Sequence, residues 1–109
     1  MGEPRMTMPT RAVLAAFMAR PADEHYGLEV SEAAGLAPGS IYPILIRLER
    51  CGWLESRWED IDKHAEGRPA RRYYRLSEKG AQAVPLALDK AKGRRRSGGA
   101  TLRPEGGLT

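Results

Sequence analysis

The side chains with the clearest chemical use gather in the stretch from Pro38 to Gly52, P-G-S-I-Y-P-I-L-I-R-L-E-R-C-G. Its polar members are a hydroxyl, a phenol and two guanidiniums, carried by Ser40, Tyr42, Arg47 and Arg50. Groups of these kinds donate hydrogen bonds to phosphate oxygens or to the edges of bases. Ile46 stands among them, which a purely solvated surface would not need. This set of side chains indicates contact with a nucleic acid.

The apolar residues of the same stretch predict a helix with one buried face. They recur at the spacing i, i+3, i+4 and i+7, as Ile41, Ile44, Leu45 and Leu48. Pro38 suits a first helical position, and Gly52 suits the left-handed residue that follows a helix. We interpret the stretch as a recognition helix. The alternative is an ordinary amphipathic core helix with a solvated basic face.

Pro43 interrupts the middle of this helix. A proline there removes a backbone hydrogen bond and crowds the preceding turn, at a cost of about 3 kcal/mol. A helix that keeps a proline at this cost is expected to use the exposed surface around it, which lacks a backbone donor, for binding. This favours the interpretation as a recognition helix.

Two helices are expected before this stretch, after a flexible arm over residues 1–9. Thr10 is a suitable N-cap for a first helix to about Ala19. One face of that helix carries Val13, Leu14, Phe17 and Met18. Acidic residues open a second helix over about 25–34, which Gly35 ends. Because a three-residue turn then leads into the recognition helix, the arrangement is a helix-turn-helix.

After Gly52 the hydropathy pattern changes to the alternation of strands, over residues 53–59 and 71–76. The charged segment between them, residues 60–69, is interpreted as the tip of a hairpin, the wing of a winged helix. Four arginines crowd its returning arm: Arg68, Arg71, Arg72 and Arg75. Beside a recognition helix they favour phosphate contact. The alternative is a solvated edge strand protected by charge.

A last helix is expected over residues 77–92, with Ser77 as its cap. Its apolar stripe consists of Ala81, Val84, Leu88 and Ala91. Pro85 should kink this helix. Residues 93–109 are rich in glycine and charge, so we expect a disordered basic tail. The predicted fold class is mainly α with a small β hairpin (α+β), as a winged helix-turn-helix domain over residues 10–76 followed by one helix.

The composition fits a single domain with a polyanionic partner. The chain has 109 residues and carries 18 Lys+Arg against 14 Asp+Glu, which gives a net charge of +4 and a pI of about 9.6. It has no run of 18 apolar residues, so we expect no membrane span. Its first residues lack an apolar secretory core, so we expect a cytoplasmic protein. The single cysteine excludes an internal disulfide and a multi-cysteine zinc site.

Catalytic and metal chemistry have little support in the sequence. A nucleophilic cysteine needs a base within hydrogen-bond reach, but Cys51 ends the recognition helix while His25 and His64 fall in other elements. No pair among these residues and Glu66 has the spacing of metal ligands. We therefore expect no enzyme activity, no metal and no cofactor. A thiol- or metal-responsive regulator is an alternative, although neighbouring arginines favour the Cys51 thiolate while the negative helix end disfavours it.

Four segments together resemble the PadR family of transcriptional regulators: Y-G-L-E-V, A-P-G-S-I-Y-P-I-L-I-R-L-E, G-W-L and G-R-P-A-R-R-Y-Y-R-L-S-E-K-G. The resemblance covers about residues 12–84, and the short chain is similar to the compact branch, whose single C-terminal helix serves dimerisation. It implies a homodimeric repressor that binds a palindromic operator in double-stranded DNA and is often released by a small molecule or another signal. The positions that it implies for DNA contact are Ser40, Tyr42, Pro43, Arg47, Arg68, Arg71 and Arg72. Ala37 and Pro85 depart from the family pattern.

A homodimer is also expected because the first and last helices offer apolar residues that one small domain cannot fully bury. The expected interface residues are Val13, Phe17, Val84 and Leu88. We expect an effector to bind between the subunits, near Phe17, Met18 or Trp53, with Cys51 as the candidate redox site. A winged helix used for protein–protein contact is the alternative from another class of function.

Overall fold

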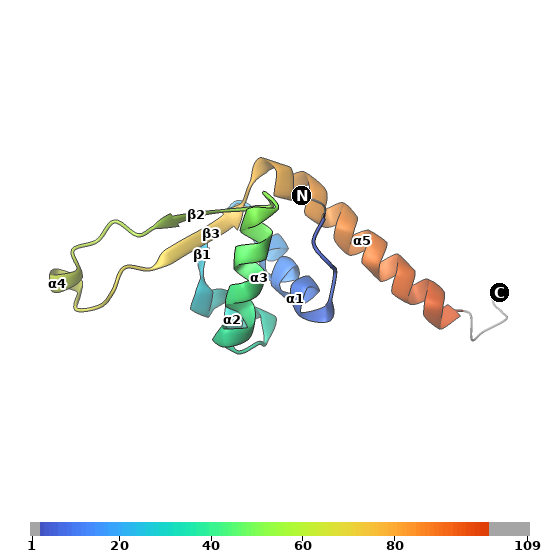
Figure 1. Ribbon diagram of the computed structural model, residues 1–109, viewed down its shortest axis with the longest axis horizontal. Coiled ribbons are helices and arrows are strands. Elements are labelled where there is room, and N and C mark those ends of the chain that lie inside the picture. The colour runs from blue at the N-terminus through green and yellow to red at the C-terminus, as the bar shows by residue number, and fades with distance from the viewer. Residues whose placement is uncertain (1–2, 101–109) are drawn as a thin grey trace.

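The computed structural model describes residues 3–100, whose course is drawn in Figure 1. In chain order the described elements are α1 (Met8–Ala19), β1 (His25–Tyr26), α2 (Gly27–Ala34), α3 (Pro38–Arg50), β2 (Leu54–Trp58), α4 (Lys63–Glu66), β3 (Arg72–Leu76) and α5 (Glu78–Ala100). Helices α1, α2 and α3 lie together in the middle, while the β2–β3 hairpin extends to one side and α5 to the other (Figure 1). The predicted winged-helix fold is confirmed.

The core lies where α1, α2, α3, the base of the sheet and the first half of α5 meet. The predicted apolar stripe of α3 is buried, namely Ile41, Ile44, Leu45 and Leu48. Phe17 of α1, Val30 of α2 and Val84 of α5 belong to the same cluster. Burial of an apolar side chain of this size contributes about 1.5–3 kcal/mol. This packing orients α3, so that the opposite face of the helix points outward.

The same burial corrects the expected dimer and effector residues. Val13, Phe17 and Val84 are at most 1% exposed, so the expectation that one domain cannot bury them is wrong. The cluster has room for them because α5 packs along α1 within one chain. Trp53 is buried in that core too, whereas Met18 and Leu88 are half-buried at its margin.

The N-terminal segment is more ordered than its sequence indicates. Thr7, not Thr10, caps α1, and its side-chain oxygen accepts a hydrogen bond from the backbone N–H of Thr10 at 3.3 Å. Met8 and Pro9 therefore belong to the first turn, where a proline loses no helical hydrogen bond. Met6 packs against the core, so the expected arm over residues 1–9 is in part wrong.

A third strand replaces the expected start of the second helix. His25 and Tyr26 form β1, which pairs antiparallel with β3, and α2 begins only at Gly27. The backbone N–H of Tyr26 donates to the Glu29 carboxylate at 3.1 Å, which caps the new helix start. Gly35 ends α2 at φ 70°, and the N–H of Leu36 reaches back to Ser31, as predicted.

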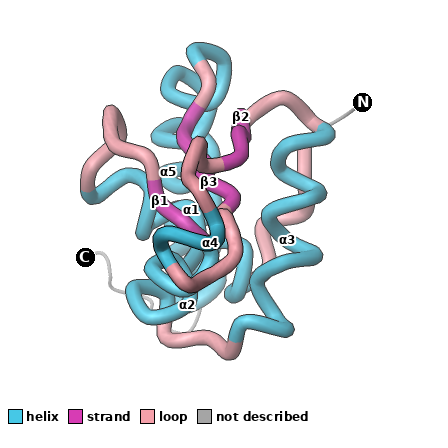
Figure 2. Tube along the Cα trace, turned by 90° about the vertical axis from the view of Figure 1, so that its left-hand side faces the viewer, coloured by secondary structure: helices cyan, strands magenta, loops and turns pink. Residues whose placement is uncertain are grey.

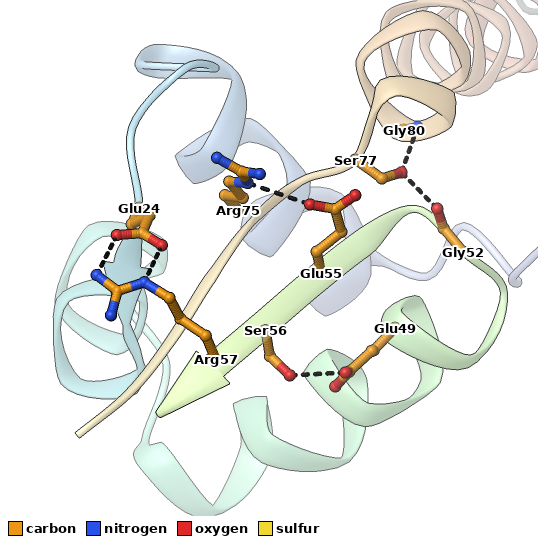
Figure 3. Close-up of polar contacts among 9 residues, drawn as sticks. All are labelled: Glu24, Glu49, Gly52, Glu55, Ser56, Arg57, Arg75, Ser77 and Gly80. Carbon is orange, nitrogen blue, oxygen red and sulfur yellow. Dashed lines mark hydrogen bonds and ion pairs between the residues drawn. The ribbon is translucent and has the colours of Figure 1, made fainter. Parts of the chain in front are cut away.

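The sheet has the strand order β1–β3–β2. The register places Leu54 opposite Leu76, Ser56 opposite Tyr74 and Trp58 opposite Arg72. Because side chains alternate along a strand, these pairs share one face of the sheet. Ser56 on this face donates a hydrogen bond to Glu49 of α3 (Figure 3), so this is the face that looks toward the recognition helix.

Helix α5 begins as predicted and ends later. The Ser77 hydroxyl accepts a hydrogen bond from the N–H of Gly80 at 2.9 Å and so caps the helix. The helix continues to Ala100, so disorder over residues 93–100 is a wrong expectation. Once a helix is nucleated, each added residue gains a hydrogen bond, which lets a lone glycine such as Gly93 be included. The rest of the expected tail, residues 101–109, lies outside the described residues.

Candidate nucleic-acid interface

The outward face of α3 carries the predicted recognition residues. Ser40, Tyr42, Pro43, Arg47 and Arg50 are all exposed, as the burial of the opposite stripe requires. Within the described part of the chain, neither the Arg47 nor the Arg50 side chain has a hydrogen bond or an ion pair. Their guanidiniums are therefore available to phosphates or bases without first breaking an internal contact.

The position of Tyr42 depends on a glycine in the preceding helix. Gly27 is the first residue of α2, and a Cβ atom added there would overlap the phenol ring and hydroxyl of Tyr42. The missing side chain of Gly27 thus creates the space that the Tyr42 ring occupies. The role of Gly27 could not be predicted, because a glycine that follows a tyrosine in the sequence gives no sign of what packs against it.

Three arginines of the wing differ from those of α3, because each side chain has a partner within the chain: Arg68, Arg71 and Arg72. Arg68 holds Glu59 by two hydrogen bonds, at 2.7 and 3.1 Å. The same carboxylate accepts the backbone N–H of Arg71 at 3.2 Å. These contacts, that with the Arg68 guanidinium first, lower the pKa of Glu59 from 4.5 to about 2. Glu59 therefore ties the two arms of the wing together at the point where the regular strand pairing ends.

Two further guanidiniums lie over aromatic rings. The Arg71 guanidinium is 4.2 Å from the ring centroid of Tyr26, and that of Arg72 is 5.1 Å from the ring of Trp58. Arg72 also lies 3.7 Å from a carboxylate oxygen of Glu49 on α3. Arg71 and Arg72 are half-buried, so only part of each side chain is accessible to a binding partner.

Carboxylates fasten the sheet to its neighbours on both faces (Figure 3). On one face, Glu49 of α3 accepts the Ser56 hydroxyl at 2.6 Å. On the other, Glu24 holds the Arg57 guanidinium by two hydrogen bonds of 2.7 Å, which lowers the pKa of Glu24 and raises that of Arg57. These contacts link the wing to α3 and to the segment before β1. Figure 2 shows the arrangement of α3 beside the sheet in a view along the hairpin.

A groove separates α3 from the wing. One hollow of about 480 Å³ lies between Tyr26, Tyr42, Trp58 and the segment 68–72. A second, of about 440 Å³, continues along α3 between Ile46, Arg50 and Trp58. Arg72 and Tyr74 line both, and burial raises the pKa of Tyr74. The groove has aromatic walls with cationic edges, a combination suited to a sugar–phosphate strand.

The described residues form no comparable site for thiol or metal chemistry. Cys51 is 8% exposed, and its thiol donates to the Leu48 carbonyl at 3.3 Å. Among the described residues, no three His, Cys, Asp or Glu side chains are grouped so that they could hold a metal ion. Nor does any described helix have the length and apolar character needed to cross a membrane.

The family model of the "Transcriptional regulator PadR-like family" matches residues 21–85, which is more than half of the chain. The chain belongs to the PadR family. The matched range contains the whole interface, from β1 through α3 and the wing to the start of α5. PadR proteins are DNA-binding transcriptional regulators.

Solved structures show the same fold. A PadR family regulator from hypervirulent Clostridium difficile has a TM-score of 0.67 and 17% identity, over 88% of this chain and 99% of that one. A PadR-like regulator from Bacillus cereus has a TM-score of 0.61 and 22% identity, over 87% and 90%. The PcaV regulator of Streptomyces coelicolor has a TM-score of 0.66 and 25% identity, over 96% and 68%. A search of curated proteins found no match to this sequence.

Replacing Gly27 by Ala should displace Tyr42 without unfolding the protein. The Tyr42 side chain is 44% exposed and can swing outward, while alanine at a helix start does not oppose the helix. Affinity for the protein's upstream DNA should fall by about 0.5–1.5 kcal/mol, the value of a lost hydrogen bond. Fluorescence anisotropy measures this. In a Tyr42→Ala background the same glycine change should cost nothing more, and an equal loss in both backgrounds would contradict the proposed contact.

Acid should loosen the wing over the range in which Glu59 takes up a proton. Because the pKa of Glu59 is lowered from 4.5 to about 2, its contribution is present above 4.5 and is lost as the pH falls toward 2. Titration by NMR should give a Glu59 pKa near 2, and Arg68→Gln should return it toward 4.5. Exchange of the Arg71 amide proton should then quicken in that variant at neutral pH. A Glu59 pKa that Arg68→Gln leaves unchanged would show that the ion pair does not form in solution.

Proposed function

We propose that the protein is a homodimeric repressor that recognises a palindromic operator through α3 and grips the flanking phosphates with the wing. The observation that carries the proposal is the contrast between the two groups of arginines. Among the described residues, the Arg47 and Arg50 side chains have no partner on the exposed face of α3. The side chains of Arg68, Arg71 and Arg72 are instead held on the wing by a carboxylate or an aromatic ring. Guanidiniums without a partner suit base edges, and guanidiniums held in place suit the regular phosphate backbone.

The proposed dimer uses α5. This helix projects away from the core (Figure 1), and Leu86 on it is 72% exposed, which is unusual for a large apolar side chain on a small basic domain. A two-fold symmetric pair would bury Leu86 against the partner's α5. It would also set the distance between the two copies of α3, which must be about 34–36 Å to enter successive major grooves.

Release by a small molecule is the third part of the proposal. The BpsR structure, from a protein 16% identical, is described as explaining regulation of DNA binding by 6-hydroxynicotinic acid, and PcaV is described in complex with its natural ligand. In this chain an effector bound between the subunits would alter the spacing of the recognition helices. The half-buried Met18 is the expected effector contact that remains accessible, since Phe17 and Trp53 lie in the core.

The arginine roles are separated by measuring affinity for operator and scrambled duplexes at several salt concentrations. Arg47→Ala should cost about 1–3 kcal/mol on the operator and much less on scrambled DNA, because only a base contact carries sequence. Arg71→Ala and Arg72→Ala should weaken both duplexes alike and reduce the salt slope by about 1. Arg75→Ala is the matched control, since Arg75 pairs with Glu55 on the sheet face away from α3. Parallel losses for Arg47→Ala on both duplexes would make it a phosphate contact.

Substitution of Leu86 tests the dimer. Sedimentation should find the unaltered protein dimeric at micromolar concentration and Leu86→Glu monomeric, because the dimer would bury a carboxylate against its partner copy. Leu28→Glu is the control: Leu28 is 49% exposed on α2 and should leave the protein dimeric. A monomeric wild type would remove the case for a palindromic operator.

A further inference from the structure

The outward face of α3 has an apolar residue near its centre. Ile46 is 46% exposed and stands in the middle of the helix, on the side opposite the buried stripe. At 100° per residue, Pro43 before it and Arg50 after it lie on the same line of the helix surface, while Tyr42 and Arg47 flank that line. A solvated or phosphate-binding face has no use for an isoleucine and a proline at its centre, since neither can donate a hydrogen bond.

One apolar group is offered to such a side chain by DNA. In the major groove every base edge carries hydrogen-bonding atoms, and the C5 methyl group of thymine is the apolar exception. The helix that enters the groove brings its most outward residues closest to the bases. Ile46, with the Pro43 ring beside it, has the character and the position to cover this methyl group and exclude water from it.

The surroundings of Ile46 fit this role. It borders the hollow of about 440 Å³ between α3 and the wing, which Arg50 and Trp58 also line. A phosphate strand in that hollow would place the adjoining base pair under the outward face of α3. The Arg50 side chain has no partner among the described residues, so it can hold the strand while Ile46 contacts the base.

We infer that Ile46 is a specificity-determining residue that recognises a thymine methyl group in each half of the operator. The inference rests on the proposed repressor function, and adds to it the identity of a base that the helix selects. It also assigns a reason for the apolar centre of a helix whose other outward residues are mostly polar.

The test uses the full-length protein and duplexes that it selects from a randomised pool. Each thymine of the selected operator is replaced, one at a time, by deoxyuridine, which pairs with adenine in the same way and lacks only the methyl group. The wild type should lose about fourfold in affinity at one thymine of each half-site, the factor that corresponds to burial of one such group. At the other thymines the replacement should have no comparable effect.

Variants then connect the lost methyl group to the side chain. Ile46→Ala should bind the thymine and deoxyuridine forms equally at that position, while Ile46→Val, which keeps two methyl groups, should retain most of the difference. Alanine is favourable in a helix and Ile46 is exposed, so the fold is not at risk. Leu28→Ala removes a similarly exposed apolar side chain from α2 and should keep the wild-type pattern.

The outcomes separate the inference from the function on which it rests. A selected operator at which no thymine is sensitive, or a sensitivity that Ile46→Ala leaves intact, would overturn the role of Ile46 and leave sequence-specific repression standing. Failure to select any sequence would overturn the proposed function itself.

Discussion

The packing of the apolar stripe of α3 is the interaction on which the rest of the molecule depends. Ile41 and Leu45 are fully buried in the core, so the helix cannot rotate without exposing them. A rotation that buried Tyr42 or Arg47 would cost both hydrophobic burial and the desolvation of a polar group. The chemistry of the outward face is therefore set by the core, and no contact on that face is needed to hold it there.

The wing shows the opposite arrangement, in which polar contacts hold the element in place. It has few buried side chains, and its direction relies on Glu59, Glu49 and Glu24, which bind arginines and a serine around the sheet. In the proposed complex, a DNA phosphate would compete with Glu59 for the Arg68 guanidinium. The net gain from Arg68 would then be the difference between two ion pairs, which is smaller than the gain from an arginine without a partner.

Sequence patterns predicted the elements whose signal is local and periodic. The apolar stripe and both ends of α3 follow from residues within the helix and its flanks. The alternation of residues 53–59 and 71–76 predicted the two strands of the hairpin. Strand β1 could not be predicted, because two residues carry no periodicity and gain their pairing only from β3, far along the chain. The acidic Glu24 was predicted to open a helix because only its neighbours in sequence were considered. Its partner is Arg57 on the sheet, which is distant in sequence.

The sequence predicted which residues belong to the candidate site better than it predicted the contacts that those residues make. The exposed set on α3 could be derived from the helix alone, but the contacts of Arg68, Arg71 and Arg72 come from residues distant in sequence. The buried state of Val13 and Val84 was likewise beyond reach, because amphipathic stripes on two helices do not say whether they meet each other or a second subunit. Whether these stripes meet within one chain depends on the packing of the first half of α5 against α1.

In the proposed dimer, the junction between α3 and α5 would link the dimer geometry to the position of α3 on DNA. The Ser77 hydroxyl donates to the Gly52 carbonyl and the Lys79 ammonium to that of Cys51, directly after α3 (Figure 3 shows the serine contact). Gly80 lies so close to the Trp53 carbonyl that any side chain there would overlap it. The start of α5 is thus fixed to the segment after α3 by hydrogen bonds to the carbonyls of residues 51–53, one of them from the backbone N–H of Ser77 to Trp53. In the proposed dimer a shift between the two α5 helices would be carried directly to the recognition helices, with no flexible linker to absorb it.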